Sequence, residues 1–134
     1  MTGCKVRGSD EYLQGTAPHT VQFHSAEYDT GGFWYPASVP ADHVAIPSSG
    51  IYLLVAYAQW PAGDGTRSIA IARNGLPLLG AEQRVSVRAS EAKLCAVCTQ
   101  VLTAGDQIGV ELHMTHESDR GVGQIQTLSV TKLD

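Results

Sequence analysis

The sequence predicts an all-β fold in which two antiparallel sheets pack face to face. Short segments rich in Val, Ile, Thr and aromatic residues recur along the chain with Gly, Pro, Asn and Asp between them, a pattern typical of a sandwich of many strands. The chain is light in the Glu, Lys and Ala runs that surface helices need, and only 16% of its residues are charged. No segment shows a sustained period of 3.6 residues.

Nine segments are predicted as strands. They are Cys4 to Gly8, Thr20 to His24, His43 to Ile46, Gly50 to Trp60, Arg67 to Arg73, Gln83 to Val87, Lys93 to Leu102, Gln107 to Thr115 and Gln124 to Leu133. Asn74-Gly75 tolerates positive φ at two positions, and Ala104-Gly105-Asp106 separates two apolar runs, so both predict turns. Asp29 to Asp42 is too irregular for a strand and too aromatic for a solvated linker, and we expect an ordered loop packed on the sandwich.

The length fits a single domain, since a chain of 134 residues buries roughly two-thirds of its unfolded surface. We expect residues 1–15 to form an N-terminal arm or attachment segment and residues 16–134 to form the folded domain. No apolar run follows Lys5 and Arg7, and the longest apolar stretch, Ile51 to Ala58, is far too short to span a bilayer. We therefore expect neither an export signal nor membrane insertion.

The charge and the cysteines bear on nucleic-acid binding, on the redox compartment and on zinc binding. The formal net charge is -4 and the nine Lys and Arg residues are scattered, so no basic stripe is available for phosphates and no nucleic-acid partner is expected. Cys4, Cys95 and Cys98 are an odd number that suits a reducing cytoplasm, and we expect three free thiols. Cys95 and Cys98 have the spacing of a zinc knuckle, but a strand sends them to opposite faces and no second ligand pair follows.

The segment Ile51 to Ala58 is apolar on both faces of its predicted strand. Because alternate side chains of a strand point to opposite faces, one of these faces needs a cover besides the domain core. Lys93 to Leu102 repeats the pattern more weakly, whereas Gln107 to Met114 alternates cleanly between apolar and polar residues. The simplest cover for the second apolar face is another copy of the chain. The alternative is that loops such as Asp29 to Asp42 cover it.

Several short motifs occur in the order found in one known family. Pro47 to Tyr52 looks like a Pro-x-x-Gly-x-Tyr entry to a central strand, Leu102 to Ile108 looks like a Leu-x-x-Gly-Asp-x-Val hairpin, and Leu128 to Leu133 is similar to a closing strand. The remaining motifs are Val21-Gln22-Phe23, Glu27-Tyr28-Asp29-Thr30, Gly32-Phe33, Val44-Ala45-Ile46 and Asn74-Gly75. Together these motifs resemble the tumour necrosis factor and complement 1q globular-head superfamily of trimeric jelly rolls, especially its short versions in phage structural proteins.

The resemblance implies a homotrimeric jelly roll with a defined interface. The side chains that it places at a three-fold axis are Leu53, Val55, Tyr57, Val97 and Thr99. The alternate side chains that it places inside the sandwich are Tyr52, Leu54 and Ala56. Because the side-chain period of a strand is two, a register shift of one residue would exchange the two sets.

Three aromatic residues, Trp34, Tyr35 and Trp60, lie in or next to predicted loops. Flat amphipathic rings bury much area at a small entropic cost, so these residues are a candidate binding surface for a host cell-surface glycan or for another protein. The alternative is that they cap the ends of the sandwich.

The sequence contains no recognisable catalytic motif. No Gly-x-Ser-x-Gly elbow, His-Glu-x-x-His or glycine-rich phosphate loop occurs, so we expect neither enzyme activity nor a cofactor. His113, His116, Glu117 and Asp119 have the chemistry of metal ligands, but a solvated loop is the simpler interpretation and no metal is assigned. A small cupin-like barrel enzyme would need inward histidines, whereas His113 points outward in the predicted register.

The resemblance to phage jelly rolls leads to a functional expectation. We expect a non-enzymatic virion structural protein, a homotrimeric capsid decoration (minor capsid) protein that reinforces the shell. It would be made in the host cytoplasm and would contact its own copies and the major capsid or tail proteins. The alternatives are a phage tail or fibre receptor-binding module, and a C1q-like carbohydrate- or protein-binding domain made by a cell.

Overall fold

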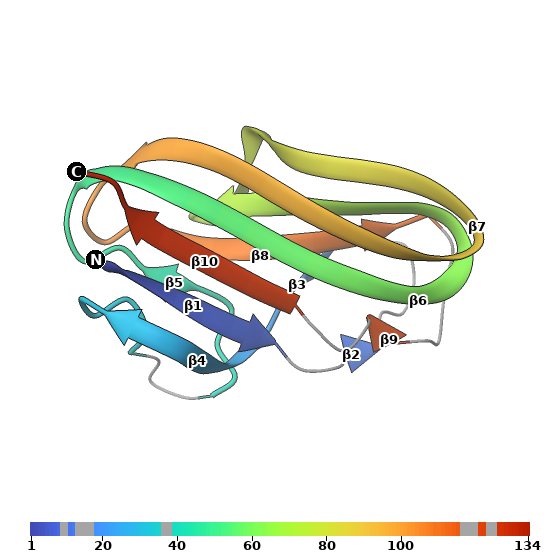
Figure 1. Ribbon diagram of the computed structural model, residues 1–134, viewed down its shortest axis with the longest axis horizontal. Coiled ribbons are helices and arrows are strands. Elements are labelled where there is room, and N and C mark those ends of the chain that lie inside the picture. The colour runs from blue at the N-terminus through green and yellow to red at the C-terminus, as the bar shows by residue number, and fades with distance from the viewer. Residues whose placement is uncertain (9–10, 13–17, 36–38, 116–120, 123–125) are drawn as a thin grey trace.

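The computed structural model describes residues 1–8, 11–12, 18–35, 39–115, 121–122 and 126–134, and these form ten β-strands (Figure 1). The strands are β1 (Gly3–Gly8), β2 (Glu11–Tyr12), β3 (His19–Thr20), β4 (Phe23–Thr30), β5 (Val44–Ala45), β6 (Gly50–Arg73), β7 (Leu76–Leu102), β8 (Gln107–Met114), β9 (Gly121–Val122) and β10 (Gln126–Lys132). The predicted all-β class is therefore confirmed. No helix in these ranges is long and apolar enough to cross a membrane.

Eight of these strands form one antiparallel sheet that curls over into two layers. Its strand order is β3-β8-β6-β10-β1-β4, with β7 paired to β6 and β5 paired to β8. β6 belongs to both layers, because residues 52–58 pair with β10 and residues 67–73 pair with β8. In Figure 1, β6, β10, β1 and β4 form the layer nearer the viewer, and β8 lies behind them. We call the nearer one the front layer.

The length of β6 and β7 differs from the prediction. The sequence divides each of them into two strands, whereas the structure continues both through the bend between the layers. Register shifts between Trp60 and Gly63 and between Gly63 and Gly65 absorb the bend, and Gly65 has a φ of 103° that suits glycine. Each bulge interrupts the hydrogen-bonded ladder locally, and the pairing of β6 with β7 resumes beyond it.

The N-terminal segment contributes a strand to the sheet, as predicted for Cys4 to Gly8, so residues 3–8 of the expected N-terminal arm belong to the folded domain. β1 pairs with β10 on one side and β4 on the other. Cys4 and Val6 are fully buried, while Lys5 and Arg7 point outward and form ion pairs with Glu27 at 3.3 and 3.5 Å. This alternation makes residues 3–8 an amphipathic strand that contributes to the core. Residues 9–10 and 13–15 lie outside the described part of the chain.

The core lies between the two layers and follows the predicted alternation. Tyr52, Leu54 and Ala56 have no exposed surface, as expected for the inward side of β6. The inward side chains of β8 are Ile108, Val110, Leu112 and Met114, all buried. On the opposite side of β8, Glu111 and His113 are half-buried.

The loop after β4 packs on the sandwich, as predicted for the described part of residues 29–42. The Asp29 carboxylate accepts hydrogen bonds from the backbone N–H groups of Phe33 and Trp34 at 2.9 and 3.0 Å. Phe33 is buried and contacts Tyr52 edge to face, with ring centroids 6.0 Å apart. Residues 36–38 lie outside the described ranges.

Two turns at one end of the molecule are joined by the carboxylate of Asp106. Asn74 and Gly75 have φ values of 52° and 83°, as predicted for a tight hairpin turn. Asp106 accepts hydrogen bonds from the backbone N–H of Thr103 at 2.8 Å and from the Asn74 amide at 3.1 Å, and it pairs with Arg73 at 2.8 Å. These contacts, the Thr103 bond first, lower the pKa of Asp106 below its ordinary value.

Acid is expected to remove the stability that Asp106 contributes. Because the folded pKa lies below the ordinary value of about 3.9, this stability is fully present above roughly pH 5 and is lost as the pH falls through the folded pKa. Asp106→Asn should therefore be less stable than the unmodified protein at pH 7, and the difference should shrink at pH 3. Urea unfolding at both pH values measures this. The exposed carboxylate of Glu82 provides a control, Glu82→Gln, for which no such difference is expected.

Candidate functional site

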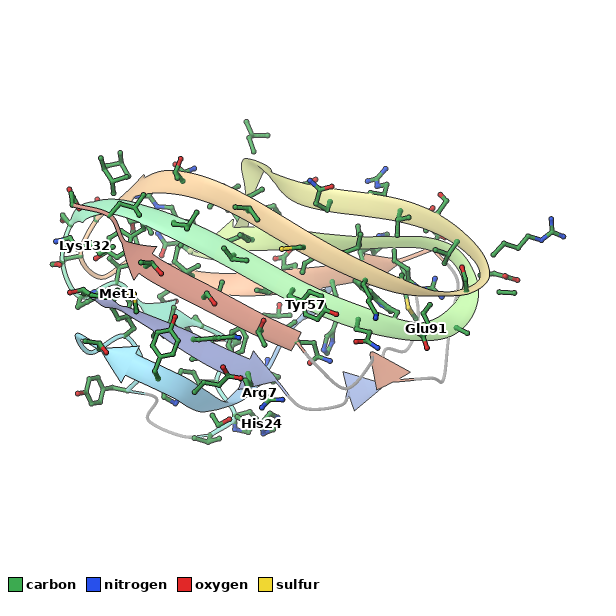
Figure 2. All side chains as sticks on the ribbon, in the orientation of Figure 1. Met1, Arg7, His24, Tyr57, Glu91 and Lys132 are labelled. Carbon is green, nitrogen blue, oxygen red and sulfur yellow. The ribbon has the colours of Figure 1, made fainter. Side chains whose placement is uncertain are left out.

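The outer face of the front layer carries apolar side chains. On β6, the residues that alternate with the core set are Leu53, Val55 and Tyr57, and all three are half-buried within the single chain. Figure 2 shows Tyr57 on the front layer, beside β10. The strand places these side chains outward because its period is two and the core occupies the other parity.

The strand register brings the five predicted interface residues together. Leu53 lies opposite Thr99, and Val55 lies opposite Val97, on β7. Tyr57 lies opposite Cys95, which has the same outward parity and is exposed. The predicted residues therefore form two adjacent rows on one face.

The apolar surface extends beyond the predicted residues. Ile51 is exposed and lies opposite Val101, which is 68% exposed, while Val97 is 52% exposed. We call Ile51, Leu53, Val55, Tyr57, Val97, Thr99 and Val101 the β6–β7 face. The sequence contained the signal for Ile51 and Val101, since both continue the outward parity of their strands.

Charge is missing from the two strand segments that carry the β6–β7 face. Residues 51–58 and 94–102 contain no Asp, Glu, Lys or Arg. The strands that continue this layer beyond β6 carry polar side chains on the same outer face. β10 presents hydroxyl side chains, and β1 and β4 present the ion pairs of Glu27. Soluble proteins usually protect an edge strand with charge, and β7 pairs only with β6 among the described strands. The uncharged stretch of β7 is therefore a candidate contact surface.

The aromatic candidates do not form one surface. Tyr35 is 85% exposed, and Trp34 is half-buried against Phe23, with ring centroids 6.4 Å apart. Trp60 was expected next to a loop, but it lies within β6 and is only 2% exposed. Its inward parity places it in the core with Tyr52 and Leu54. Trp60 is therefore removed from the candidate binding surface, which keeps Trp34 and Tyr35.

The cysteines differ in their surroundings, and all three thiols are free as predicted. Burial, with a smaller contribution from Asp29, raises the pKa of Cys4 to about 12, so this thiol is unreactive near neutral pH. Cys98 is half-buried against the core, and burial raises its pKa as well. Cys95 is exposed beside the β6–β7 face. The two residues of the Cys-x-x-Cys pair thus point to opposite sides of β7, as expected.

The structure gives no support for a metal centre in its described part. No group of three or more His, Cys, Asp or Glu side chains there is arranged to hold an ion. His113 lies opposite Ser68 on the outer side of β8 and is half-buried. The other predicted candidates, His116, Glu117 and Asp119, lie outside the described residues.

Comparisons with known proteins identify the fold. No known protein family and no curated protein matches the sequence. The globular domain of zebrafish complement 1qA protein superposes with a TM-score of 0.72 at 13% identity, covering 100% of this chain and 98% of that one. Murine APRIL, crystallised at pH 5.0, superposes with a TM-score of 0.70 at 18% identity, covering 98% of each chain. At these identities the likeness concerns the fold, and the chain is a TNF/C1q-like jelly roll.

Proposed function

We propose that this protein is a non-enzymatic, homotrimeric virion protein of a phage, a decoration protein that binds and reinforces the capsid. The observation that carries the proposal is the uncharged, apolar β6–β7 face on a TNF/C1q-like jelly roll. Such a face needs a cover in solution. The loop after β4 was the alternative cover, but Phe33 of this loop packs on the opposite side of β6, against the buried Tyr52.

Other copies of the chain are the cover that fits best. A closed ring of three copies would bury the β6–β7 face of each at a common axis and would leave no apolar face open. The hydroxyl side chains of β10 and the ion pairs of β1 and β4 would then lie toward the rim, where water remains accessible. This division into an apolar centre and a polar rim is typical of protein interfaces.

The proposed mechanism is multivalent binding without bond chemistry. Three copies of each exposed loop would face the same way and would bind a repetitive surface with avidity. The loop after β4 carries the most exposed aromatic side chain of the described chain, Tyr35, together with Val39, which is also exposed. A compact trimer held in this way would link neighbouring subunits of a shell, so its partners would be its own copies and the major capsid or tail proteins.

The sequence resemblance to short phage jelly rolls and the three free thiols support the virion assignment. Thiols of this kind suit a protein made in the reducing cytoplasm of a host and then assembled into particles. The absence of a catalytic motif from the sequence supports a structural role over an enzymatic one.

Purified virus particles from the source of this sequence provide the test. We expect the protein to be present in stoichiometric amounts, to be located on the capsid by immunogold labelling, and to raise the temperature at which particles lose their DNA. A particle preparation that lacks the protein, or labelling confined to tails, would contradict capsid decoration. Labelling confined to tails would support the tail or fibre alternative.

A second candidate function is a C1q-like domain that binds a carbohydrate or a protein. Tyr35 favours it, because an exposed aromatic ring on an ordered loop is a common recognition element. In that case Tyr35→Ala should abolish binding to a glycan or protein array without changing the oligomeric mass. Capsid decoration alone predicts no array ligand.

A further inference from the structure

A buried arginine lies in the bend of β6, away from the β6–β7 face. Arg67 is only 4% exposed and lies opposite Val85 on β7 and Met114 on β8. Burial lowers its pKa below the ordinary value, and the charge of Asp64 opposes this effect. A cation in such a position normally needs a partner of opposite charge.

The described residues leave this cation without an ion pair. The Arg67 Nη1 group donates a hydrogen bond to the backbone carbonyl oxygen of Asp64 at 2.7 Å. The carboxylate of Asp64 is used elsewhere, because its Oδ1 accepts the backbone N–H of Ala89 at 2.6 Å. Among the described side chains, none forms a salt bridge with Arg67.

One edge of the guanidinium group is unused. The Nε–H of Arg67 is buried and no described residue accepts a hydrogen bond from it. Nη2, which retains some contact with solvent, donates no hydrogen bond to the described residues. Nε and Nη2 form the fork of parallel donors that binds a carboxylate or a phosphate with two hydrogen bonds. The structure thus holds a two-donor edge with no acceptor.

The backbone is shaped around this edge. Nη2 lies only 2.8 Å from the position that a Cβ atom would occupy on Gly63, so the guanidinium rests where any other residue would place a side chain. Trp60, at the start of the same bend, also has a buried N–H, Nε1, without an acceptor among the described residues. Two buried side chains of one bend therefore have unpaired donors, a combination that native proteins usually avoid.

We propose that the bend of β6 binds a small oxyanion, a carboxylate or a phosphate, on the Nε–Nη2 edge of Arg67. The anion would accept hydrogen bonds from Nε and Nη2 and would neutralise the cation. This site does not depend on self-association or on a virion role. A negative result for the anion site would therefore leave the proposed function unaffected, and the reverse also holds.

The test is a titration of the full-length protein with inorganic phosphate and, separately, with acetate at constant ionic strength. Backbone and indole N–H signals in NMR spectra report binding. We expect saturable binding of one of these anions, with signals of the β6 bend and of Trp60 shifting together. Saturable binding of phosphate alone would indicate a phosphate site, and saturable binding of acetate alone would indicate a carboxylate site. Two flat titrations would overturn the proposal.

Three variants distinguish anion binding by the two donors of Arg67 from nonspecific attraction of the anion to positive charge. Arg67→Gln should weaken binding at least about tenfold, since a hydrogen bond to a charged group contributes that much. Arg67→Lys keeps the charge without the fork and should bind with intermediate strength. Arg84→Gln is the matched control on β7, because Arg84 is exposed and lies opposite Ser68, next to Arg67. Equal weakening by Arg84→Gln would identify nonspecific attraction and would refute the site.

A second route is available if Arg67→Gln does not fold. Gly63→Ala places a methyl group against Nη2 and should displace the guanidinium while its charge is kept. Loss of anion binding in folded Gly63→Ala is the expected result, and unchanged affinity would contradict the proposed position of the anion.

Discussion

Leu53→Glu combined with Tyr57→Glu is expected to convert the assembly into single chains of 14.2 kDa. The unmodified protein should have a mass near three times that value by light scattering. At a three-fold axis the two substitutions would bring six carboxylates together away from water, at a cost of several kcal/mol for each buried charge. Because Leu53 and Tyr57 point away from the core, each chain should still fold.

A matched substitution outside the β6–β7 face separates a specific effect from a general one. Tyr35→Glu likewise replaces a tyrosine by a carboxylate, at an exposed position outside this face, and it should leave the mass unchanged. A stable monomer for the unmodified protein at high concentration would refute self-association. A dimer would keep the face as an interface but would exclude the three-fold arrangement.

The thiols provide an independent measurement of the same interface. Cys95 is exposed beside Tyr57, so a thiol reagent should modify it quickly in the monomeric variant and slowly in the assembly. Cys4 should remain unmodified in both, because it is buried and its pKa is raised to about 12. Equal rates at Cys95 in the two proteins would place the interface elsewhere.

Local patterns predicted the features that depend on the strand period and on turn chemistry. The alternation in residues 51–58 assigned Tyr52 and Leu54 to the core and Leu53 and Val55 to the other side, and the burial of these side chains agrees. Asn74-Gly75 predicted its turn because few other residue pairs accept positive φ at both positions. These inferences need only the chain's own geometry.

The features that the sequence missed depend on contacts between distant segments. The bulges that carry β6 through the bend depend on its pairing with β7 on both sides of the bend, which no local pattern reveals. Trp60 became a core residue once β6 continued past it, and the same continuation buried Arg67. The unpaired guanidinium edge therefore had no signal in the sequence, where a single arginine between polar residues is unremarkable.

Leu54→Ala and Leu53→Ala are expected to act on different equilibria although the residues are neighbours. Leu54 is fully buried between the layers, so its truncation should lower the free energy of unfolding by about 3 kcal/mol and the melting temperature by roughly 10 °C. That loss should be independent of protein concentration. Leu53 lies on the β6–β7 face, and its truncation should lower the melting temperature mainly by weakening association.

Protein concentration separates the two effects, because only a linked association equilibrium depends on it. For Leu53→Ala, the deficit in melting temperature should be near zero at concentrations where both proteins are monomeric, and it should grow to a plateau as the unmodified protein associates. For Leu54→Ala, the deficit should persist at every concentration, while the oligomeric mass stays unchanged. If the two variants exchanged these behaviours, the register of β6 would be shifted by one residue and the assigned face would be the core. The pair therefore tests the strand parity on which both the core and the proposed interface depend.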